Sequence, residues 1–196
     1  MRALVVVAHP VDDSFTHAAA STAADALRRA GHHVDVIDLY AIGFRAAMST
    51  EERDAYETDA PVLDPQVAEH VELLRQADTL VFVYPTWWSS MPAILKGWLE
   101  RTMVPGVAFT FDGTNRVRPG LTHIRRIVGI STYGSKRLYV RAINDNGRRT
   151  ISRALRLSTG VRARLDWLAL YGIDSCSSEE RERFLDRVST RMVALR

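Results

Sequence analysis

The sequence contains a single cysteine, Cys176, among its 196 residues. One thiol cannot build an internal disulfide framework, a CxxC motif or a cysteine cluster for a metal. No apolar run reaches the length of about 18 residues that a membrane-spanning helix needs, and the N-terminal segment lacks the cleavage region of a secretory signal. We therefore expect a soluble, cytoplasmic protein without an integral membrane segment and without a metal site.

Two glycine-rich nucleotide motifs are also missing. The chain has 11 glycines, but they form neither the GxGxxG pattern of a Rossmann dinucleotide site nor the GxxxxGK[ST] pattern of a P-loop. A nucleotide or phosphate that binds this protein is therefore expected to use a different kind of loop.

Neither sign of charge dominates the chain. It has 26 Lys and Arg against 23 Asp and Glu, which gives a net charge of +3. The densest basic run consists of Arg148, Arg149, Arg153, Arg156, Arg162 and Arg164. A solvent-exposed face is the favoured interpretation, and a clamp for dinucleotide phosphates is the alternative. Nucleic-acid binding is disfavoured, because aromatic residues are not interleaved with these arginines.

What the sequence does contain is a regular alternation of strand and helix patterns. Short apolar runs rich in β-branched residues predict strands, and longer amphipathic runs predict helices. The expected strands are 3–9, 33–40, 79–85, 125–132 and 163–172. The expected helices are 15–31, 65–77, 91–103, part of 138–157 and 177–195, whereas 104–125 is expected to be irregular. This order predicts one α/β domain over 1–196, a doubly wound five-stranded parallel sheet with helices on both faces.

Helix ends and helix faces can be predicted in several places. Ser49 and Ser177 each precede a glutamate by three residues, which is the spacing of a capping box. Within 91–103, the residues Ile94, Leu95, Trp98 and Leu99 recur at helical spacing and are expected to face the sheet, with Lys96 and Arg101 outside.

In an open parallel sheet, ligands bind beyond the carboxyl ends of the strands. The first loop at this edge, HPVDDSFTHA (9–18), joins a strand to a helix whose N-terminus could hold a phosphate. Ser14 and Thr16 could add hydroxyl donors, and His9 could face the ligand. A simple capped turn, with Asp13 or Ser14 as the N-cap, is the alternative interpretation.

The second loop at this edge, YPTWWSSMP (84–92), contains two adjacent tryptophans. Burying a large aromatic side chain contributes about 1.5–3 kcal/mol, so Trp87 and Trp88 are expected to pack against something flat. The core, a partner chain and a planar ligand are the candidates. The third loop, STYGSKRLY (131–139), contains Thr132 and Gly134, and here an ordinary turn is the alternative to a ligand contact.

These three loops resemble those of the flavodoxin-like NAD(P)H:quinone oxidoreductases. The segments that carry the resemblance are AHPVDDSF, YPTWWSSMPAILKGWLERT and STYGS, in the family's order and across most of the chain. The resemblance implies a noncovalent flavin, FMN or FAD, with NAD(P)H as co-substrate. It also implies a homodimer whose catalytic pocket is shared between subunits.

The resemblance assigns roles to individual residues. Around the flavin phosphate and ribityl chain it places His9, Ser14, Phe15 and Thr16. Along the isoalloxazine it places Pro85, Thr86, Trp87, Trp88 and Ser89, and at the other edge Ser131, Thr132, Tyr133 and Gly134. Tyr139 falls on a tyrosine near the flavin carbonyl edge, where it would stabilise charge on the reduced flavin. The histidine that accompanies this tyrosine in the family is replaced here by Asp145.

The implied activity is hydride transfer from NAD(P)H through the flavin to a quinone or another planar acceptor, in a ping-pong cycle. Three alternatives remain open from the sequence. The chain could be a flavin-containing regulatory subunit that acts by binding a partner protein, or a flavin-free relative of the same fold. It could also be a one-electron flavodoxin carrier, although such carriers tend to be strongly acidic and this chain is not.

Overall fold

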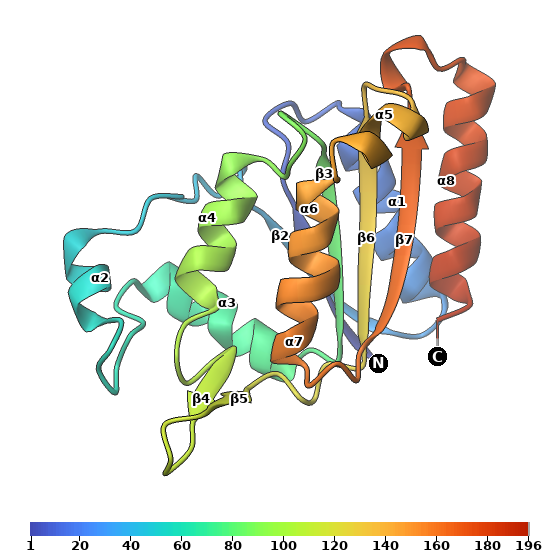
Figure 1. Ribbon diagram of the computed structural model, residues 1–196. Coiled ribbons are helices and arrows are strands. Elements are labelled where there is room, and N and C mark those ends of the chain that lie inside the picture. Colours follow the sequence, from blue (N-terminus) through green and yellow to red (C-terminus); the bar gives the residue numbers. More distant parts are fainter. Residues whose placement is uncertain (196) are drawn as a thin grey trace.

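In the computed structural model, which describes residues 1–195, a five-stranded parallel sheet forms the centre of the molecule (Figure 1). Its order is β2-β1-β3-β6-β7. The strands are β1 (Arg2–Val7), β2 (His33–Asp38), β3 (Thr79–Pro85), β6 (Arg126–Tyr133) and β7 (Arg164–Tyr171). The predicted α/β class and the doubly wound parallel sheet are confirmed. The strand order reverses between β1 and β3, which is where ligands bind in such folds.

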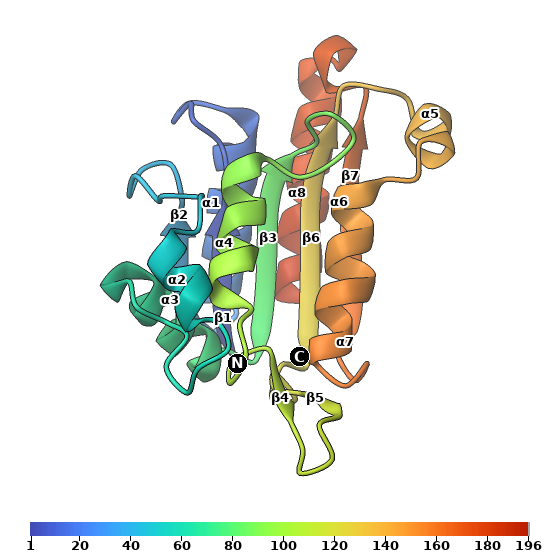
Figure 2. The ribbon, with the colours of Figure 1, turned by 60° about the vertical axis from the view of Figure 1, so that its left-hand side comes forward.

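Helices cover both faces of the sheet (Figures 1 and 2). The longer ones are α1 (Phe15–Arg29), α3 (Pro65–Gln76), α4 (Ala93–Thr102) and α8 (Ser178–Val193). The shorter helical segments are α2 (Thr50–Ala55), α5 (Arg137–Ala142), α6 (Asn146–Arg149), the π-helical η1 (Thr150–Leu155), α7 (Arg156–Ser158) and the 3-10 turn η2 (Ile173–Ser175). No helix in residues 1–195 is both long enough and apolar enough to span a membrane.

Two hydrophobic clusters hold the layers together. One joins α1 and α8 to the first sheet face, and the other joins α3, α4 and η1 to the second face. All seven residues of β3 are buried, as expected for the middle strand of a sheet covered on both sides. The C-terminal helix packs on the sheet through one face, on which Phe184, Val188 and Met192 are buried in the first cluster.

The predicted helix caps agree with the structure. Ser49 and Ser177 form complete capping boxes with Glu52 and Glu180. Ser14, one of the two candidates, caps α1, because its Oγ accepts the backbone N–H of His17 at 3.2 Å.

Two sequence predictions are wrong. The stretch 104–125 is not wholly irregular, since it contains a short antiparallel hairpin of β4 (Phe109–Phe111) and β5 (Val117–Pro119). Arg101 does not lie outside α4: it is 2% exposed. Its guanidinium donates to Glu52 Oε1 at 2.9 Å, to Asp64 Oδ2 at 2.7 Å and to the Arg45 carbonyl at 2.6 Å. The segment 39–64 folds over that face of the helix and supplies the partners, which helical periodicity alone cannot reveal.

Candidate functional site

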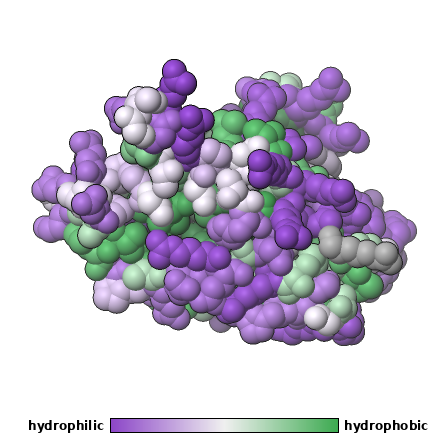
Figure 3. All heavy atoms as spheres, turned by 90° about the horizontal axis from the view of Figure 1, so that it is seen from below, coloured by the Kyte–Doolittle hydropathy of each residue, from purple (hydrophilic) through white to green (hydrophobic). Residues whose placement is uncertain are grey.

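The three predicted loops lie together at the carboxyl edge of the sheet. They follow β1, β3 and β6, which are neighbours in the sheet, at the end of the molecule that is uppermost in Figure 1. The opposite end carries the hairpin β4–β5 and the amino ends of the strands. Hydrophilic residues cover most of that opposite face in Figure 3.

The first loop is braced by a histidine that the sequence analysis did not single out. The ring of His17 lies between two partners, with Nδ1 2.9 Å from Ser14 Oγ and Nε2 2.7 Å from Asp38 Oδ2. The Ser-x-x-His spacing at the start of a helix was the available signal, but Asp38 comes from the end of β2. This contact fixes the Ser14 hydroxyl beside the N-terminus of α1.

The other residues of the first loop differ in whether their side chains are exposed. Thr16 is buried, and the Phe15 ring packs on Phe184 of α8 with 6.0 Å between centroids. His9 lies at the surface of the loop, where its Nδ1 accepts the Val11 N–H at 3.1 Å. Phe15 and Thr16 can therefore offer backbone groups to a ligand, whereas their side chains belong to the scaffold.

The second loop is a tight two-residue hairpin turn. Trp87 and Ser90 exchange both backbone hydrogen bonds at 3.0 Å, and the central residues Trp88 and Ser89 have φ of 46° and 61°. Positive φ at two successive central residues is the signature of a type I′ turn, which favours Asn-Gly. A tryptophan there is strained, and strain of this kind gathers at ligand sites.

The turn places the Trp88 side chain in the open. Trp88 is fully exposed and Trp87 is 41% exposed, with its ring 5.8 Å from the ring of His9. The backbone N–H groups of Trp88 and Ser89 donate to no acceptor within residues 1–195. A flat ring beside free backbone donors is an arrangement that suits a planar, hydrogen-bonding ligand.

Hydrogen bonds join the third loop to the second loop. Thr86 Oγ1 lies 3.0 Å from Ser131 Oγ, and the Thr86 N–H donates to the Thr132 carbonyl at 2.8 Å, so the second and third loops are joined. Ser131 and Thr132 are buried. A Cβ added at Gly134 would lie 2.7 Å from Asp174 Oδ2, which is the end of a flexible side chain, so a larger residue there would require the Asp174 side chain to move.

Tyr133 is held under the loop rather than over a ligand. Its hydroxyl donates to Asp145 Oδ2 at 3.0 Å and accepts the Trp167 Nε1–H at 3.2 Å, while its ring stacks on Tyr171. Burial raises the pKa of the Tyr133 phenol above its ordinary value, and the nearby Asp145 carboxylate raises it further. Tyr133 is 1% exposed, so it forms part of the wall of the site and has no open ring face.

A cavity of about 260 Å³ lies between the second loop, the third loop and α5. Six of the predicted site residues line it: Thr86, Trp88, Ser89, Tyr133, Gly134 and Tyr139. The remaining ones, His9, Ser14, Phe15, Thr16, Pro85, Trp87, Ser131 and Thr132, lie outside its lining. Tyr139 is exposed on α5. The fold is that of a doubly wound α/β protein, and this cavity lies at the carboxyl ends of β3 and β6.

Comparison with known proteins gives the family. Residues 1–191 match the family described as flavodoxin-like fold. NAD(P)H dehydrogenase [quinone] 1 of Rattus norvegicus is 33% identical over 153 residues, which are 70% of this chain. The chain belongs to the family of flavodoxin-like NAD(P)H:quinone oxidoreductases. This chain spans about half the length of the rat enzyme, since the match covers 56% of that relative.

Solved structures agree with this assignment. The NAD(P)H:quinone oxidoreductase from Methanothermobacter marburgensis is 29% identical with a TM-score of 0.82, and the match covers 98% of this chain and 96% of that one. An FMN-dependent NADH-azoreductase from Bacillus anthracis, solved in complex with FMN, has a TM-score of 0.76 at 18% identity and 98% coverage of both chains. At that identity the likeness concerns the fold.

Proposed function

We propose that this protein is a flavin-dependent NAD(P)H oxidoreductase that reduces a quinone or a similar planar acceptor by two electrons, with donor and acceptor using one site in turn. The observation that carries the proposal is the exposed Trp88 ring, held by a strained turn at the carboxyl end of the middle strand. Family membership supplies the reaction class, and the exposed ring and free backbone donors supply a place for it.

The residues at the sheet edge fit a flavin. The free N–H groups of Trp88 and Ser89 could donate to the acceptor atoms of an isoalloxazine, and the Trp88 ring could cover its face. Ser14 and the N-terminus of α1 could hold a phosphate, with Phe15 and Thr16 contributing backbone groups. Bound flavin would supply two-electron redox chemistry, and the protein would supply orientation and electrostatics.

Tyr139 would act as a hydrogen-bond donor at the rim of this site. Asp145, which stands where the family has histidine, is already engaged, because its carboxylate accepts the Tyr133 hydroxyl and caps α6. We therefore assign stabilisation of developing negative charge to Tyr139 and to backbone donors, with no part for Asp145.

We also propose that the protein is a homodimer. Trp88, Leu138 and Tyr139 are exposed around the site, and a second subunit packed there would cover them. Light scattering of the purified protein should give the mass of two chains; the mass of one chain would contradict this assembly. The cytoplasmic location stays a prediction from the sequence.

The purified protein should be yellow, with absorbance at about 450 nm from bound oxidised flavin. It should oxidise NAD(P)H with a quinone when no other protein is present. Chromatography of the released cofactor then identifies FMN or FAD. Colourless protein that fails to take up either flavin would contradict the proposal. Bound flavin without turnover would favour the alternative, a regulatory subunit that acts through a partner protein.

Replacing Trp88 with alanine should weaken flavin affinity about tenfold, because aromatic stacking on a planar ring contributes about 1–3 kcal/mol. The measurement is the flavin dissociation constant by fluorescence titration of apoprotein. Trp87→Ala is the matched control and should cost less, since the Trp87 ring is partly packed toward His9. Equal affinities of Trp88→Ala and the unmodified protein would show that Trp88 does not contact the flavin.

A further inference from the structure

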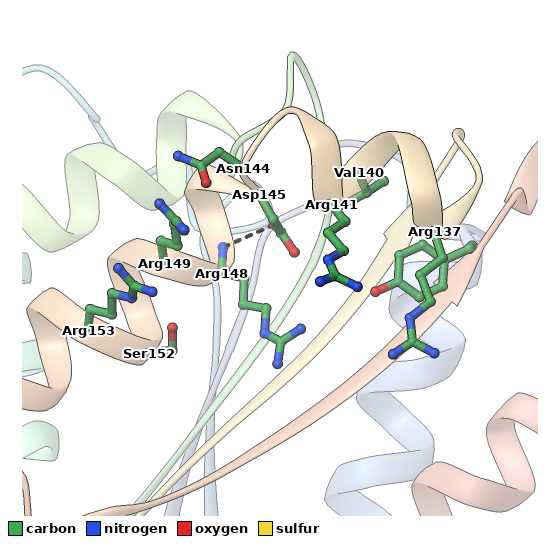
Figure 4. A pocket seen from close by; sticks show the side chains of 10 residues that line it. Arg137, Val140, Arg141, Asn144, Asp145, Arg148, Arg149, Ser152 and Arg153 are labelled. Atoms are coloured by element: carbon green, nitrogen blue, oxygen red, sulfur yellow. Dashed lines mark hydrogen bonds between the residues drawn. The ribbon is translucent and has the colours of Figure 1, made fainter.

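A second cavity, of about 400 Å³, lies beside the candidate flavin site and is lined by arginines (Figure 4). Helix α5 contributes Arg137 and Arg141, α6 contributes Arg148 and Arg149, and η1 contributes Arg153. In Figure 4, the side chains of Arg141 and Arg148 extend into the space between α5 and α6. We call this space, with the five arginines that line it, the arginine cavity.

The six arginines of the sequence cluster are exposed or half-buried, and five of them border two separate cavities. Arg148, Arg149 and Arg153 line the arginine cavity. Arg156 instead donates to the Ala163 carbonyl at 2.9 Å, and Arg162 and Arg164 border a separate cavity near the amino ends of the strands. The other two arginines of the cavity, Arg137 and Arg141, come from α5. They lie outside the basic run that the sequence shows, so the sequence did not indicate them.

The arginine cavity concentrates positive charge that the protein itself does not neutralise. Its lining contains five guanidinium groups and one carboxylate, that of Asp145, whereas the whole chain has a net charge of only +3. No ion pair within residues 1–195 joins any of the five to an acidic side chain. Like charges gathered in a concave site repel one another and raise the local concentration of anions.

The geometry suits phosphate groups. Arg137 and Arg141 are four residues apart on one helix, so they project from the same side of α5. On the facing segment, the Arg148 guanidinium lies over the Trp167 ring, 5.5 Å from its centroid, which restricts its position. Planar guanidinium groups on two sides of a cavity can bind a phosphate through paired hydrogen bonds.

The arginine cavity adjoins the candidate flavin site. Val140 and Asp145 line both cavities, so the two cavities are adjacent. A ligand that carries a planar ring at one end and several phosphates at the other could occupy both. A nicotinamide dinucleotide has this form, and a long nucleic acid would instead require an extended basic surface with stacking aromatics.

We propose that the arginine cavity binds the phosphate groups of the nicotinamide dinucleotide, including a 2′-phosphate, and so selects NADPH over NADH. The inference rests on the proposed function, because that function supplies the reason for a dinucleotide to bind here. The extra 2′-phosphate brings an anion for guanidinium groups that otherwise have no anionic partner. NADH, which lacks that anion, leaves part of the cavity unmatched.

The test is calorimetric titration of the flavin-loaded protein with 2′,5′-ADP and with 5′-AMP, which differ only in the 2′-phosphate. We expect 2′,5′-ADP to bind about tenfold more tightly than 5′-AMP, because its 2′-phosphate adds one charged hydrogen-bonded contact. Arg141→Gln and Arg149→Gln should each weaken 2′,5′-ADP binding about tenfold. Arg116→Gln makes the same charge change in the hairpin at the other end of the sheet and should leave binding unchanged, since charge effects decay over about 8 Å in physiological salt.

Equal affinity for the two nucleotides, or equal losses in Arg141→Gln and Arg116→Gln, would overturn the site. Steady-state kinetics separate this result from failure of the proposed function. Turnover with equal KM for NADH and NADPH, unchanged in Arg141→Gln, overturns the arginine cavity and leaves the oxidoreductase intact. Arginine-dependent binding of 2′,5′-ADP by a protein that oxidises neither donor overturns the oxidoreductase and leaves the anion site.

Discussion

Replacing Arg101 with methionine is expected to lower the free energy of unfolding by about 3–5 kcal/mol, because it removes the buried cation of the buried Glu52 carboxylate and leaves Glu52 with the exposed Arg45. Arg101 donates to Glu52, to Asp64 and to the carbonyl of Arg45, and these partners come from the segment that crosses α4. Methionine can fill much of the volume but cannot satisfy those acceptors. Urea unfolding at pH 7, followed by tryptophan fluorescence, measures the effect.

The same substitution should change how stability depends on pH. Desolvation raises the pKa of Glu52, but the hydrogen bonds from Arg101 and from the Ser49 backbone outweigh it and hold the pKa below its ordinary value. The Arg101 hydrogen bond likewise lowers the pKa of Asp64. Groups with lowered pKa stabilise the fold above their unfolded values, about 4.3 and 3.9, and lose this contribution as pH falls through the folded values. Arg101→Met should therefore flatten the acid limb of the stability curve.

A control on the same helix distinguishes the buried network from any charge change. Lys96 is exposed and pairs with Glu100 one turn away, so Lys96→Met should cost less than about 1 kcal/mol. If Arg101→Met cost no more than Lys96→Met, the buried ion network would contribute nothing specific to stability.

Gly97→Ala is expected to have the second large effect on stability. Helix propensity alone predicts that this substitution stabilises the protein, whereas we expect it to destabilise the protein. Alanine in a helix interior is normally about 1 kcal/mol more favourable than glycine. At Gly97, however, an added Cβ would lie 2.2 Å from the Ala46 carbonyl oxygen, a backbone atom that cannot move aside as a side chain could. We expect a net destabilisation of about 1–3 kcal/mol from this overpacking, measured by the same urea unfolding.

Gly113→Ala is the matched glycine control. Nothing lies within 4 Å of a Cβ added there, and the residue has no positive φ. Its stability should change by less than about 0.5 kcal/mol, the usual range for surface substitutions. A stabilised Gly97→Ala protein would mean that the segment around Ala46 does not press against α4 in solution.

Both positions bear on the site, because α4 begins directly after the turn that carries Trp88. Gly97 and Arg101 fix α4 against the segment that contains Ala46 and Glu52, and so fix the end of that turn. Trp88→Ala should therefore lower flavin affinity with little loss of stability, since its side chain is fully exposed. Gly97→Ala and Arg101→Met should instead act mainly on the free energy of unfolding.

The sequence by itself determined the layer architecture. Buried runs such as 79–85 are almost wholly apolar, and amphipathic runs alternate with them, so the parallel sheet follows from local pattern and connection rules. The capping boxes at Ser49 and Ser177 are equally local, since both partners lie within one helical turn. The loops at the sheet edge, with the tryptophan pair, could be placed because strand ends fix their position.

Only the tertiary structure decided which polar groups meet. The carboxylate partners of Arg101 lie 37 and 49 residues away, His17 of α1 contacts Asp38 at the end of β2, and Tyr133 donates to Asp145, which follows α5 in the chain. Periodicity assigns a residue to a helix face but not to the segment that later covers that face. The arginine cavity was hidden for the same reason: two short helices on either side of a chain reversal bring their guanidinium groups to one space, and hydrophobic patterning carries no information about that approach.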